Sequence, residues 1–282
     1  MRNLSDIGVI KDVMSRHGFS FSKALGQNFI VDPTVCPRIA EMGGCEEDVG
    51  VIEIGAGVGV LTAELAKRAK KVVCVELDKR LLPVLDETLA DFDNIEIVND
   101  DILKIDLRRL IEEKFSGMRV IVCANLPYYI TSPVIMLLLE SKLPIDSVTV
   151  MVQKEAGDRL CAEVGSRDAG AVTAAVNYYA EAEKLFNVSR GCFIPSPKVD
   201  SMVIKLTLRK EPLMVLNDEK KFFSLIKAAF GQRRKTAVNS ISSGMGIPKD
   251  RVAQALSEAG FSSDVRAEKF TMEDFKKLCE LL

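Results

Sequence analysis

The sequence predicts an α/β fold, a Rossmann-like and doubly wound parallel sheet, followed by a small all-helical C-terminal domain. Three observations support this prediction. Short β-rich runs alternate with helical patterns from residue 49 to residue 155, which is typical of parallel strands joined by helices. A glycine-rich turn connects the first of these runs to a helix. After residue 211 the hydrophobic patterns are helical.

The first elements form one βαβ unit. The stretch "VGVIEIGAGVGVLTAELAKRAKKVVCVELD" at 49–78 contains a strand, the glycine turn, a helix and a second strand. Further β-rich runs occupy 94–103, 119–129 and 147–155, and helical patterns occupy Leu81 to Leu89 and Ser132 to Leu139.

The last strand and the helical tail set the domain boundary. Alternation from Val199 to Leu208 predicts a strand at the end of the sheet. Helical patterns then cover 219–230, 235–243, 250–259 and 272–282. We therefore expect a sheet domain at 1–210, which includes an N-terminal arm at 1–45, and a helical domain at 211–282.

Composition excludes several function classes. The chain has 282 residues, a net charge of -2 and one histidine, His17, so histidine triads and multi-histidine metal sites are excluded and we expect no metal. Its seven cysteines form no CxxC pair, which favours reduced thiols and a cytoplasmic location. No signal peptide or membrane-spanning run is visible. Residues 209–282 hold 14 Lys/Arg against 10 Asp/Glu, a local excess that permits contact with nucleic acid.

The glycine turn predicts a nucleotide-like cofactor. Gly55, Gly57 and Gly59 follow a strand and open a helix, where the backbone can approach a ligand closely. Glu76 ends the next strand, where a carboxylate can bind both ribose hydroxyls. A dinucleotide dehydrogenase and an S-adenosylmethionine methyltransferase both fit this pattern. The GxGxG spacing after Glu53 favours the methyltransferase, because an acid suits a cationic methionine end better than a pyrophosphate.

The third strand adds an acidic pair. Asp101 lies at its end in "NDDIL", where its carboxylate can accept a hydrogen bond from an adenine amino group while Ile102 lines the ring. Asp100 is the rival acceptor. Because ligands bind at the carboxyl ends of strands in open α/β sheets, we expect these residues to share one crevice with Gly55 and Glu76.

The fourth strand ends in "NLPYY", residues 125–129. This resembles the motif of methyltransferases that modify exocyclic amino nitrogens. The Asn125 side-chain oxygen and the Leu126 carbonyl, held by Pro127, can accept hydrogen bonds from an adenine amino group as positive charge develops on it. Tyr128 can stack on a flipped base. We expect Tyr129 to pack beneath Tyr128 as a structural neighbour.

The ordered motifs resemble the KsgA family of ribosomal RNA adenine dimethyltransferases over nearly the whole chain. They are "KALGQNFIVD" (23–32), "EIGAGVG" (53–59), "VELD" (75–78), "NDDIL" (99–103), "NLPYYITSP" (125–133), "MVQKE" (151–155), "FIPSPKVDS" (193–201) and "GQRRKTAVNS" (231–240). The resemblance implies a class I methyltransferase sheet, S-adenosylmethionine as cofactor and small-subunit ribosomal RNA in immature subunits as the partner.

The resemblance also implies roles for further residues. By motif, Gln27, Asn28 and Ile30 would close over the methionine end of the cofactor. The same cofactor site would be completed by Gly55, Glu76, Asp101 and Asn125. Phe193 would stack on the target adenine opposite Tyr128. The residues of the basic run, Arg233, Arg234 and Lys235, would lie near phosphates. Three alanines depart from the common family pattern, which puts RNA contacts around them in doubt. They are Ala169, Ala171 and Ala237.

The expected function is therefore dimethylation of two adjacent adenines at N6, in a hairpin loop near the 3' end of 16S ribosomal RNA, by a monomeric enzyme during small-subunit assembly. Two alternatives remain. An Erm-type enzyme would modify a large-subunit adenine, although "FIPSPKVDS" and the helical tail disfavour it. A non-enzymatic assembly checkpoint would bind the immature subunit with methylation secondary.

Overall fold

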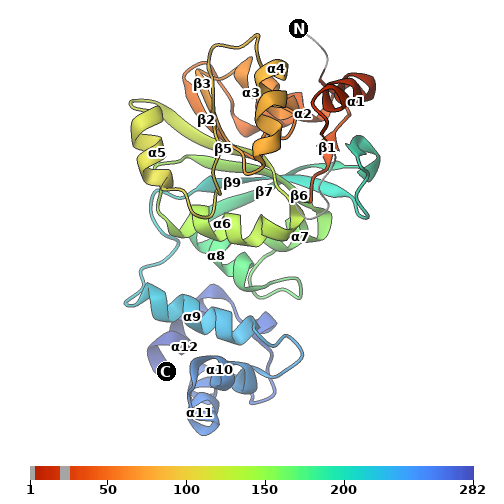
Figure 1. Cartoon of the computed structure of the whole chain (residues 1–282). Coiled ribbons are helices and arrows are strands. Elements are labelled where there is room, and N and C mark those ends of the chain that lie inside the picture. The colour runs from red at the N-terminus through yellow and green to blue at the C-terminus, as the bar shows by residue number, and fades with distance from the viewer. Residues whose placement is uncertain (1–3, 20–25) are drawn as a thin grey trace. The chain divides into compact units, whose positions relative to one another are not determined.

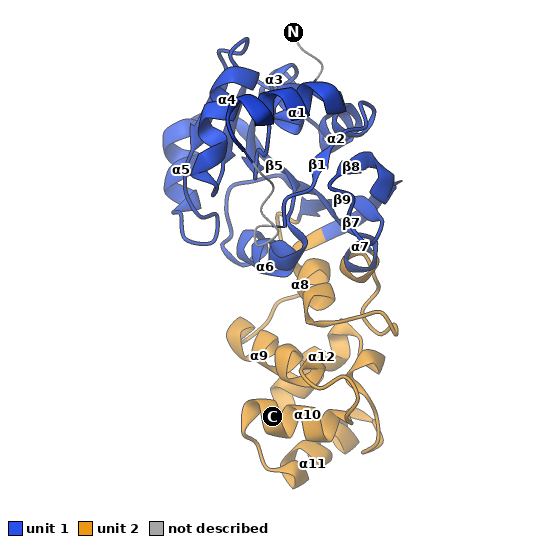
Figure 2. Ribbon diagram, turned by 45° about the vertical axis from the view of Figure 1, so that its right-hand side comes forward, with its two compact units in different colours: residues 1–157, 181–208 blue, residues 158–180, 209–282 orange. Residues whose placement is uncertain are grey.

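The chain forms two compact units (Figure 2) in a computed structural model that describes residues 4–19 and 26–282. The first unit contains the sheet and the second is helical. Unit 1 comprises Met1–Gly157 and Glu181–Leu208, and unit 2 comprises Asp158–Ala180 and Arg209–Leu282.

Unit 1 is built on a seven-stranded sheet with the order β4-β3-β2-β5-β6-β9-β7. The ladders from β4 to β6 are parallel, and β9 runs antiparallel to β6. Strands β2 and β5 are buried along nearly their whole length, as expected for a sheet covered on both faces. The strands are β2 (Val49–Ile54), β3 (Lys71–Val75), β4 (Ile95–Val98), β5 (Arg119–Asn125), β6 (Ser147–Gln153), β7 (Ala180–Val188) and β9 (Ser201–Leu208).

Helices lie on both sides of this sheet. Figure 1 shows α2, α3 and α4 on one side and α6 and α7 on the other. No helix in the described ranges is long and apolar enough to span a membrane. The helices up to residue 160 are α1 (Ile7–Arg16), α2 (Val35–Gly43), α3 (Val60–Ala66), η1 (Lys79–Leu81), α4 (Leu82–Thr88), α5 (Leu107–Lys114), η2 (Tyr128–Ile130), α6 (Thr131–Glu140) and α7 (Lys154–Leu160), and η3 (Arg190–Cys192) follows later in the unit.

The predicted last strand is present but does not end the sheet. β9 lies between β6 and β7, and β7 forms the edge. The β7 sequence "AEAEKLFNV" mixes exposed and half-buried residues without regular alternation, and only its two ends are buried. An edge strand tolerates such charged residues, and this weak hydrophobic pattern explains why the sequence did not predict the strand.

The N-terminal arm, predicted at 1–45, contributes regular elements to unit 1. Its described part contains α1, α2 and the short strand β1 (Phe29–Ile30). β1 pairs antiparallel with β8 (Phe193–Ile194), so that Ile30 lies opposite Phe193. Residues 23–25 of the "KALGQNFIVD" motif lie outside the described residues.

Unit 2 is all-helical, and it begins earlier in the chain than the predicted boundary at residue 210. Residues 158–180 belong to it because Tyr178 on α8 is buried against Phe222 and Phe223 of α9. Hydrophobic patterns along the sequence do not show which core a helix joins. Its helices are α8 (Ala171–Tyr179), α9 (Glu219–Phe230), α10 (Ala237–Met245), α11 (Lys249–Ala259), η4 (Ala267–Lys269) and α12 (Met272–Leu281).

Candidate active site

One pocket in unit 1 brings together the residues predicted from separate motifs. It lies where β2, β3, β4 and β5 end, the edge at which open α/β sheets bind ligands. The loop before β1 forms another part of its wall. The predicted residues that line it are Gln27, Asn28, Ile30, Gly55, Gly57, Glu76, Asp101, Ile102, Asn125, Leu126, Pro127 and Tyr128.

The glycine turn forms the floor of the cofactor half of this pocket. Gly55, Gly57 and Gly59 all have positive φ angles, a conformation that residues with a Cβ atom rarely adopt. A Cβ atom on Gly57 would also lie 3.2 Å from Cε1 of Phe29. The backbone here is therefore bare, and a ligand can approach its N–H groups closely.

Glu76 connects this turn to the end of β3. One carboxylate oxygen accepts a hydrogen bond from Gly57 N–H at 3.1 Å, and the other accepts from Asp78 N–H at 2.8 Å. The side chain is buried, and burial raises the pKa of Glu76, partly offset by these hydrogen bonds. The carboxylate is thus held at the pocket wall, where it can accept hydrogen bonds from ribose hydroxyls.

Glu53, the acid before the glycines, is buried more deeply. Its exposed fraction is 1%, and burial raises its pKa to about 7, although a hydrogen bond from Cys74 Sγ opposes this rise. Glu53 lines the same pocket. Because a cation placed here would favour its ionised form, the residue suits the cationic methionine end of S-adenosylmethionine.

Asp78 was not predicted from the sequence, yet it fastens the predicted Gln27 to the pocket. Its carboxylate accepts a hydrogen bond from Gln27 Nε2 at 2.9 Å. It also accepts from Arg80 Nε and Nη2, at 2.8 and 2.6 Å, and the Arg80 hydrogen bond lowers the pKa of Asp78. The acid in "VELD" that follows Glu76 by two residues was the available signal.

The acidic pair after β4 lies at the other end of the pocket. Asp100 and Asp101 both line it, and Ile102 is buried beside them. Asp101 Oδ1 caps the backbone by accepting from Leu103 N–H at 3.0 Å, and its Oδ2 lies 3.3 Å from Lys104 Nζ. The position fits contact with an adenine ring, and either carboxylate can serve as the acceptor.

Asn125 is oriented by a residue distant in sequence. Its Nδ2 donates to the main-chain carbonyl of Asn28 at 3.2 Å, while Asn28 Nδ2 donates to Gly26 O at 3.0 Å. Since the nitrogen is used in this bond, Asn125 Oδ1 is the atom that can accept a hydrogen bond from a substrate amine. Next to it, Leu126 N–H donates to Met151 O at 3.3 Å, which ties the motif to β6.

The two tyrosines of "NLPYY" differ in their surroundings. Tyr128 is half-buried, and its hydroxyl shares a 2.8 Å hydrogen bond with Ser201 Oγ. The expectation that Tyr129 packs beneath Tyr128 is wrong, because Tyr129 is 56% exposed. Tyr129 lines the pocket close to Gly26. A Cβ atom added to Gly26 would lie 3.4 Å from Tyr129 Cδ1.

The remaining predicted residues lie elsewhere. Phe193 is 5% exposed, packs in the core of unit 1 and stands outside the pocket wall formed by the described residues. The basic run 233–235 is exposed in the turn between α9 and α10 of unit 2, where Arg233 Nη2 donates to Arg167 O at 3.1 Å. Ala169 and Ala237, two of the departures from the family pattern, are fully buried.

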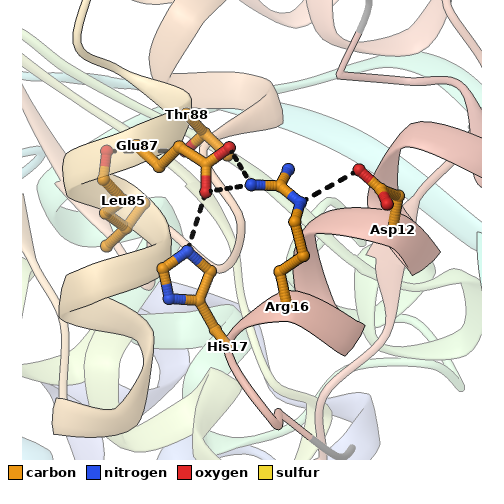
Figure 3. A network of polar contacts seen from close by, with 6 residues as sticks. All are labelled: Asp12, Arg16, His17, Leu85, Glu87 and Thr88. Carbon is orange, nitrogen blue, oxygen red and sulfur yellow. Dashed lines mark hydrogen bonds and ion pairs between the residues drawn. The ribbon is translucent and has the colours of Figure 1, made fainter.

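A polar network fastens the N-terminal helix α1 to α4 (Figure 3). Glu87 on α4 accepts hydrogen bonds from Arg16 Nη1 at 2.6 and 2.7 Å. Its Oε2 also lies 2.8 Å from His17 Nε2, so the single histidine takes part in this contact and not in the pocket wall. Arg16 Nε donates back to Asp12 within α1. This network fastens the end of α1 to α4.

Comparisons with known proteins agree with this site. A family model described as ribosomal RNA adenine dimethylase matches residues 18–282. Proteins named ribosomal RNA small subunit methyltransferase A from Bacillus cytotoxicus and Bacillus mycoides are 46% and 45% identical to the chain over 286 residues, which covers 100% of this chain and 98% of each relative.

Solved structures give the same result. The 23S rRNA methyltransferase ErmE is 30% identical, with a TM-score of 0.66 over 90% of this chain and 99% of its own. A dimethyladenosine transferase from Plasmodium falciparum, 24% identical, shares the fold with a TM-score of 0.69 over 89% of this chain and 95% of its own. These matches confirm the predicted methyltransferase fold and its cofactor, S-adenosylmethionine, and they leave no support for a dehydrogenase. The chain belongs to the ribosomal RNA adenine dimethylase family.

Proposed function

We propose that this protein methylates N6 of two adjacent adenines in a hairpin loop near the 3' end of 16S ribosomal RNA, during assembly of the small subunit, to give N6,N6-dimethyladenosine. Two relatives that match the chain from end to end are named as small-subunit enzymes. The bound cofactor supplies a methyl group on a sulfonium, which is already activated for transfer.

The orientation of Asn125 is the observation that carries this proposal. The lone pair of an adenine amino nitrogen is delocalised into the ring, so the nitrogen is a poor nucleophile until its geometry becomes pyramidal. Asn125 Oδ1 and the Leu126 carbonyl can accept hydrogen bonds from this amine, and these bonds strengthen as positive charge develops on it. The contact from Asn125 Nδ2 to Asn28 O selects the required amide orientation. Tyr128 stacks on the flipped base.

In the cofactor half, the residues present fit S-adenosylmethionine. The bare turn at Gly55 and Gly57 admits close approach, Glu76 binds the ribose hydroxyls, and Asp101 with Ile102 holds the adenine. Gln27, Asn28 and Ile30 close over the methionine end. This assignment is supported by their common position on one pocket wall.

RNA contacts beyond the pocket involve unit 2. The exposed cations Arg233, Arg234 and Lys235 suit the phosphates of the immature subunit. Stacking of Phe193 on the target base stays a prediction from the family resemblance. Its side chain is buried in the core of unit 1, so stacking requires this side chain to become accessible. We further propose that the protein acts as a monomer in the cytoplasm.

Methylation of isolated subunits tests the proposal. Immature small subunits and mature large subunits are incubated separately with the protein and labelled S-adenosylmethionine, and ribosomal RNA fragments are analysed by mass. Dimethylated adenines in a 3'-terminal fragment of the small-subunit RNA are expected. Label confined to the large-subunit RNA would instead support an Erm-type activity, which the similarity to ErmE brings into consideration.

A checkpoint role is separable from catalysis. The Asn125→Ala variant is expected to bind immature small subunits as the unmodified protein does while transferring methyl groups about a hundred- to a thousandfold more slowly. If no methylation of either subunit occurs with the unmodified protein while small-subunit binding is tight, the checkpoint reading replaces the enzymatic one.

A further inference from the structure

Ser201 is a buried serine that contacts the proposed adenine site from a distant part of the chain. Its exposed fraction is 0%, and its Oγ atom lies 2.8 Å from the hydroxyl of Tyr128, 73 residues away. It is the first residue of β9. This hydrogen bond reaches the far end of the Tyr128 ring from a strand that contributes no residue to the pocket wall of the described chain.

The backbone around Ser201 is held firmly. Ser201 lies opposite Gln153 in the antiparallel β6–β9 ladder. The carbonyl of the preceding residue, Asp200, accepts a hydrogen bond from Lys154 N–H at 3.0 Å. Strand β6 also accepts the Leu126 N–H at Met151 O. One strand therefore supports both the "NLPY" backbone and the serine that holds its tyrosine.

Tyr128 needs such support because its own segment is short. It begins the three-residue turn η2 after Pro127, so little regular structure fixes its side chain. Rotation about the Cα–Cβ bond of a tyrosine has three staggered wells, and a change between them moves the ring and its hydroxyl together. A hydrogen bond at the hydroxyl holds the ring in one of these positions, and a base can stack only on a ring that lies in the right place.

We propose that Ser201 is a positioning residue that fixes the place of the Tyr128 ring for stacking on the target adenine. This inference rests on the proposed function, in which Tyr128 is the stacking face. Burial raises the pKa of the Tyr128 hydroxyl, so the hydroxyl stays protonated at neutral pH and keeps its place in the hydrogen bond.

A double-mutant cycle tests this inference. Ser201→Ala, Tyr128→Phe and the double variant are assayed with immature small subunits. Each single change is expected to lower kcat/KM for RNA by about three- to tenfold, the range for one hydrogen bond. The double variant is expected to match the single variants, because all three lack the same bond. Ser201→Thr, which keeps a hydroxyl, restores most of the activity, and the affinity for S-adenosylmethionine stays unchanged throughout.

Ser147→Ala is the matched control. Ser147 is also a buried serine of the β6–β9 pair, but it lies at the opposite end, across from Thr207. Its removal is expected to leave kcat/KM unchanged.

A spectroscopic experiment uses RNA with 2-aminopurine at the target position. Stacking of the 2-aminopurine on Tyr128 quenches the fluorescence of this base. Ser201→Ala is expected to weaken the quenching, whereas Ser147→Ala is not.

The outcomes separate this inference from the proposed function. If Tyr128→Ala abolishes methylation but Ser201→Ala is as active and as quenched as the unmodified protein, the positioning role is refuted and the stacking role stands. If Tyr128→Ala methylates at the full rate, the stacking role itself fails. Additive losses in the double variant also overturn the inference, because they show two independent effects.

Discussion

The two halves of the pocket are built in different ways. The cofactor half contains Gly55, Gly57, Glu76 and Asp101, and the adenine half, which is proposed to receive the target base, contains Asn125, Leu126 and Tyr128. In the cofactor half, Glu76 accepts hydrogen bonds from Gly57 and Asp78, residues 19 and 2 positions away. In the adenine half, Asn125 contacts Asn28 across 97 positions and Tyr128 contacts Ser201 across 73. The cofactor half is therefore largely a product of consecutive strand–helix turns, to which Asp78 fastens Gln27 across 51 positions. The adenine half depends on the loop before β1 and on β9.

The largest expected effect comes from breaking the adenine half at Asn125. Asn125→Ala removes an acceptor that acts when charge develops on the amine, so kcat is expected to fall by about a hundred- to a thousandfold. The affinity for S-adenosylmethionine, measured by calorimetry, is expected to change by less than about threefold.

Asn94→Ala is the control for this variant. Asn94 Nδ2 also donates to main-chain carbonyls, those of Ala66 and Ala69, but it lies outside the pocket wall of the described chain. It is expected to retain kcat. Equal losses of kcat in both variants would show that a general loss of packing, and not a missing acceptor, reduces the rate.

The same contrast explains what the sequence could predict. The βαβ repeat sets the spacing of the glycine turn, of Glu76 after the next strand and of Asp101 after the third. The sequence therefore predicted correctly that these residues of the cofactor half lie near one another. The amide orientation of Asn125 and the hydroxyl partner of Tyr128 depend on contacts between distant segments, which no local pattern records. The edge strand β7 was missed because only its two ends are buried, so its sequence carries no clear hydrophobic alternation.

A pH experiment sharpens the comparison in the cofactor half. Burial raises the pKa of Glu53 from 4.5 to about 7, so between these values the folded protein holds a proton that the unfolded chain has released. Glu53 therefore makes the folded protein less stable as pH rises from about 4.5 to 7, by roughly 3 kcal/mol in total. Glu53→Gln is expected to remove this decline.

Chemical denaturation from pH 5 to pH 8 measures the difference between the two proteins, in which the contributions of other carboxylates cancel. The free energy gained by Glu53→Gln is expected to increase with pH and to level off above about 7. A constant difference across this range would mean that Glu53 is already ionised at pH 5. S-adenosylmethionine is expected to shrink the difference, because its cationic end favours the ionised acid.

A substitution in the cofactor half is expected to have a smaller effect, and this effect appears in the Kd for S-adenosylmethionine and not in kcat. Glu76→Gln removes the charge that binds the ribose hydroxyls, so the Kd for S-adenosylmethionine is expected to rise about ten- to a hundredfold, with kcat at saturating cofactor nearly unchanged. Glu96→Gln is the control, because Glu96 is an acid of the neighbouring strand β4 that pairs with Lys71 and Lys114. A large fall in kcat with an unchanged Kd would place Glu76 in the adenine half.

The smallest effect is expected at the network in Figure 3, which fastens α1 to α4 outside both halves of the pocket. Hydrogen bonds from Arg16 and His17 lower the pKa of Glu87 from 4.5 to about 2. A lowered pKa means that this contribution to stability is fully present above about 4.5 and is lost as pH falls toward 2. Glu87→Gln is expected to speed amide hydrogen exchange within α1 by less than about tenfold at pH 7, because the network is partly exposed to solvent.

Glu113→Gln, which breaks an exposed ion pair with Arg109 within α5, controls for the loss of a surface charge and should leave exchange in α1 unchanged. If α1 exchanges at the same rate in all three proteins, the network does not hold the helix, and the loop that carries Asn28 to Asn125 must be held by its own contacts, chief among them the bond from Gln27 to Asp78.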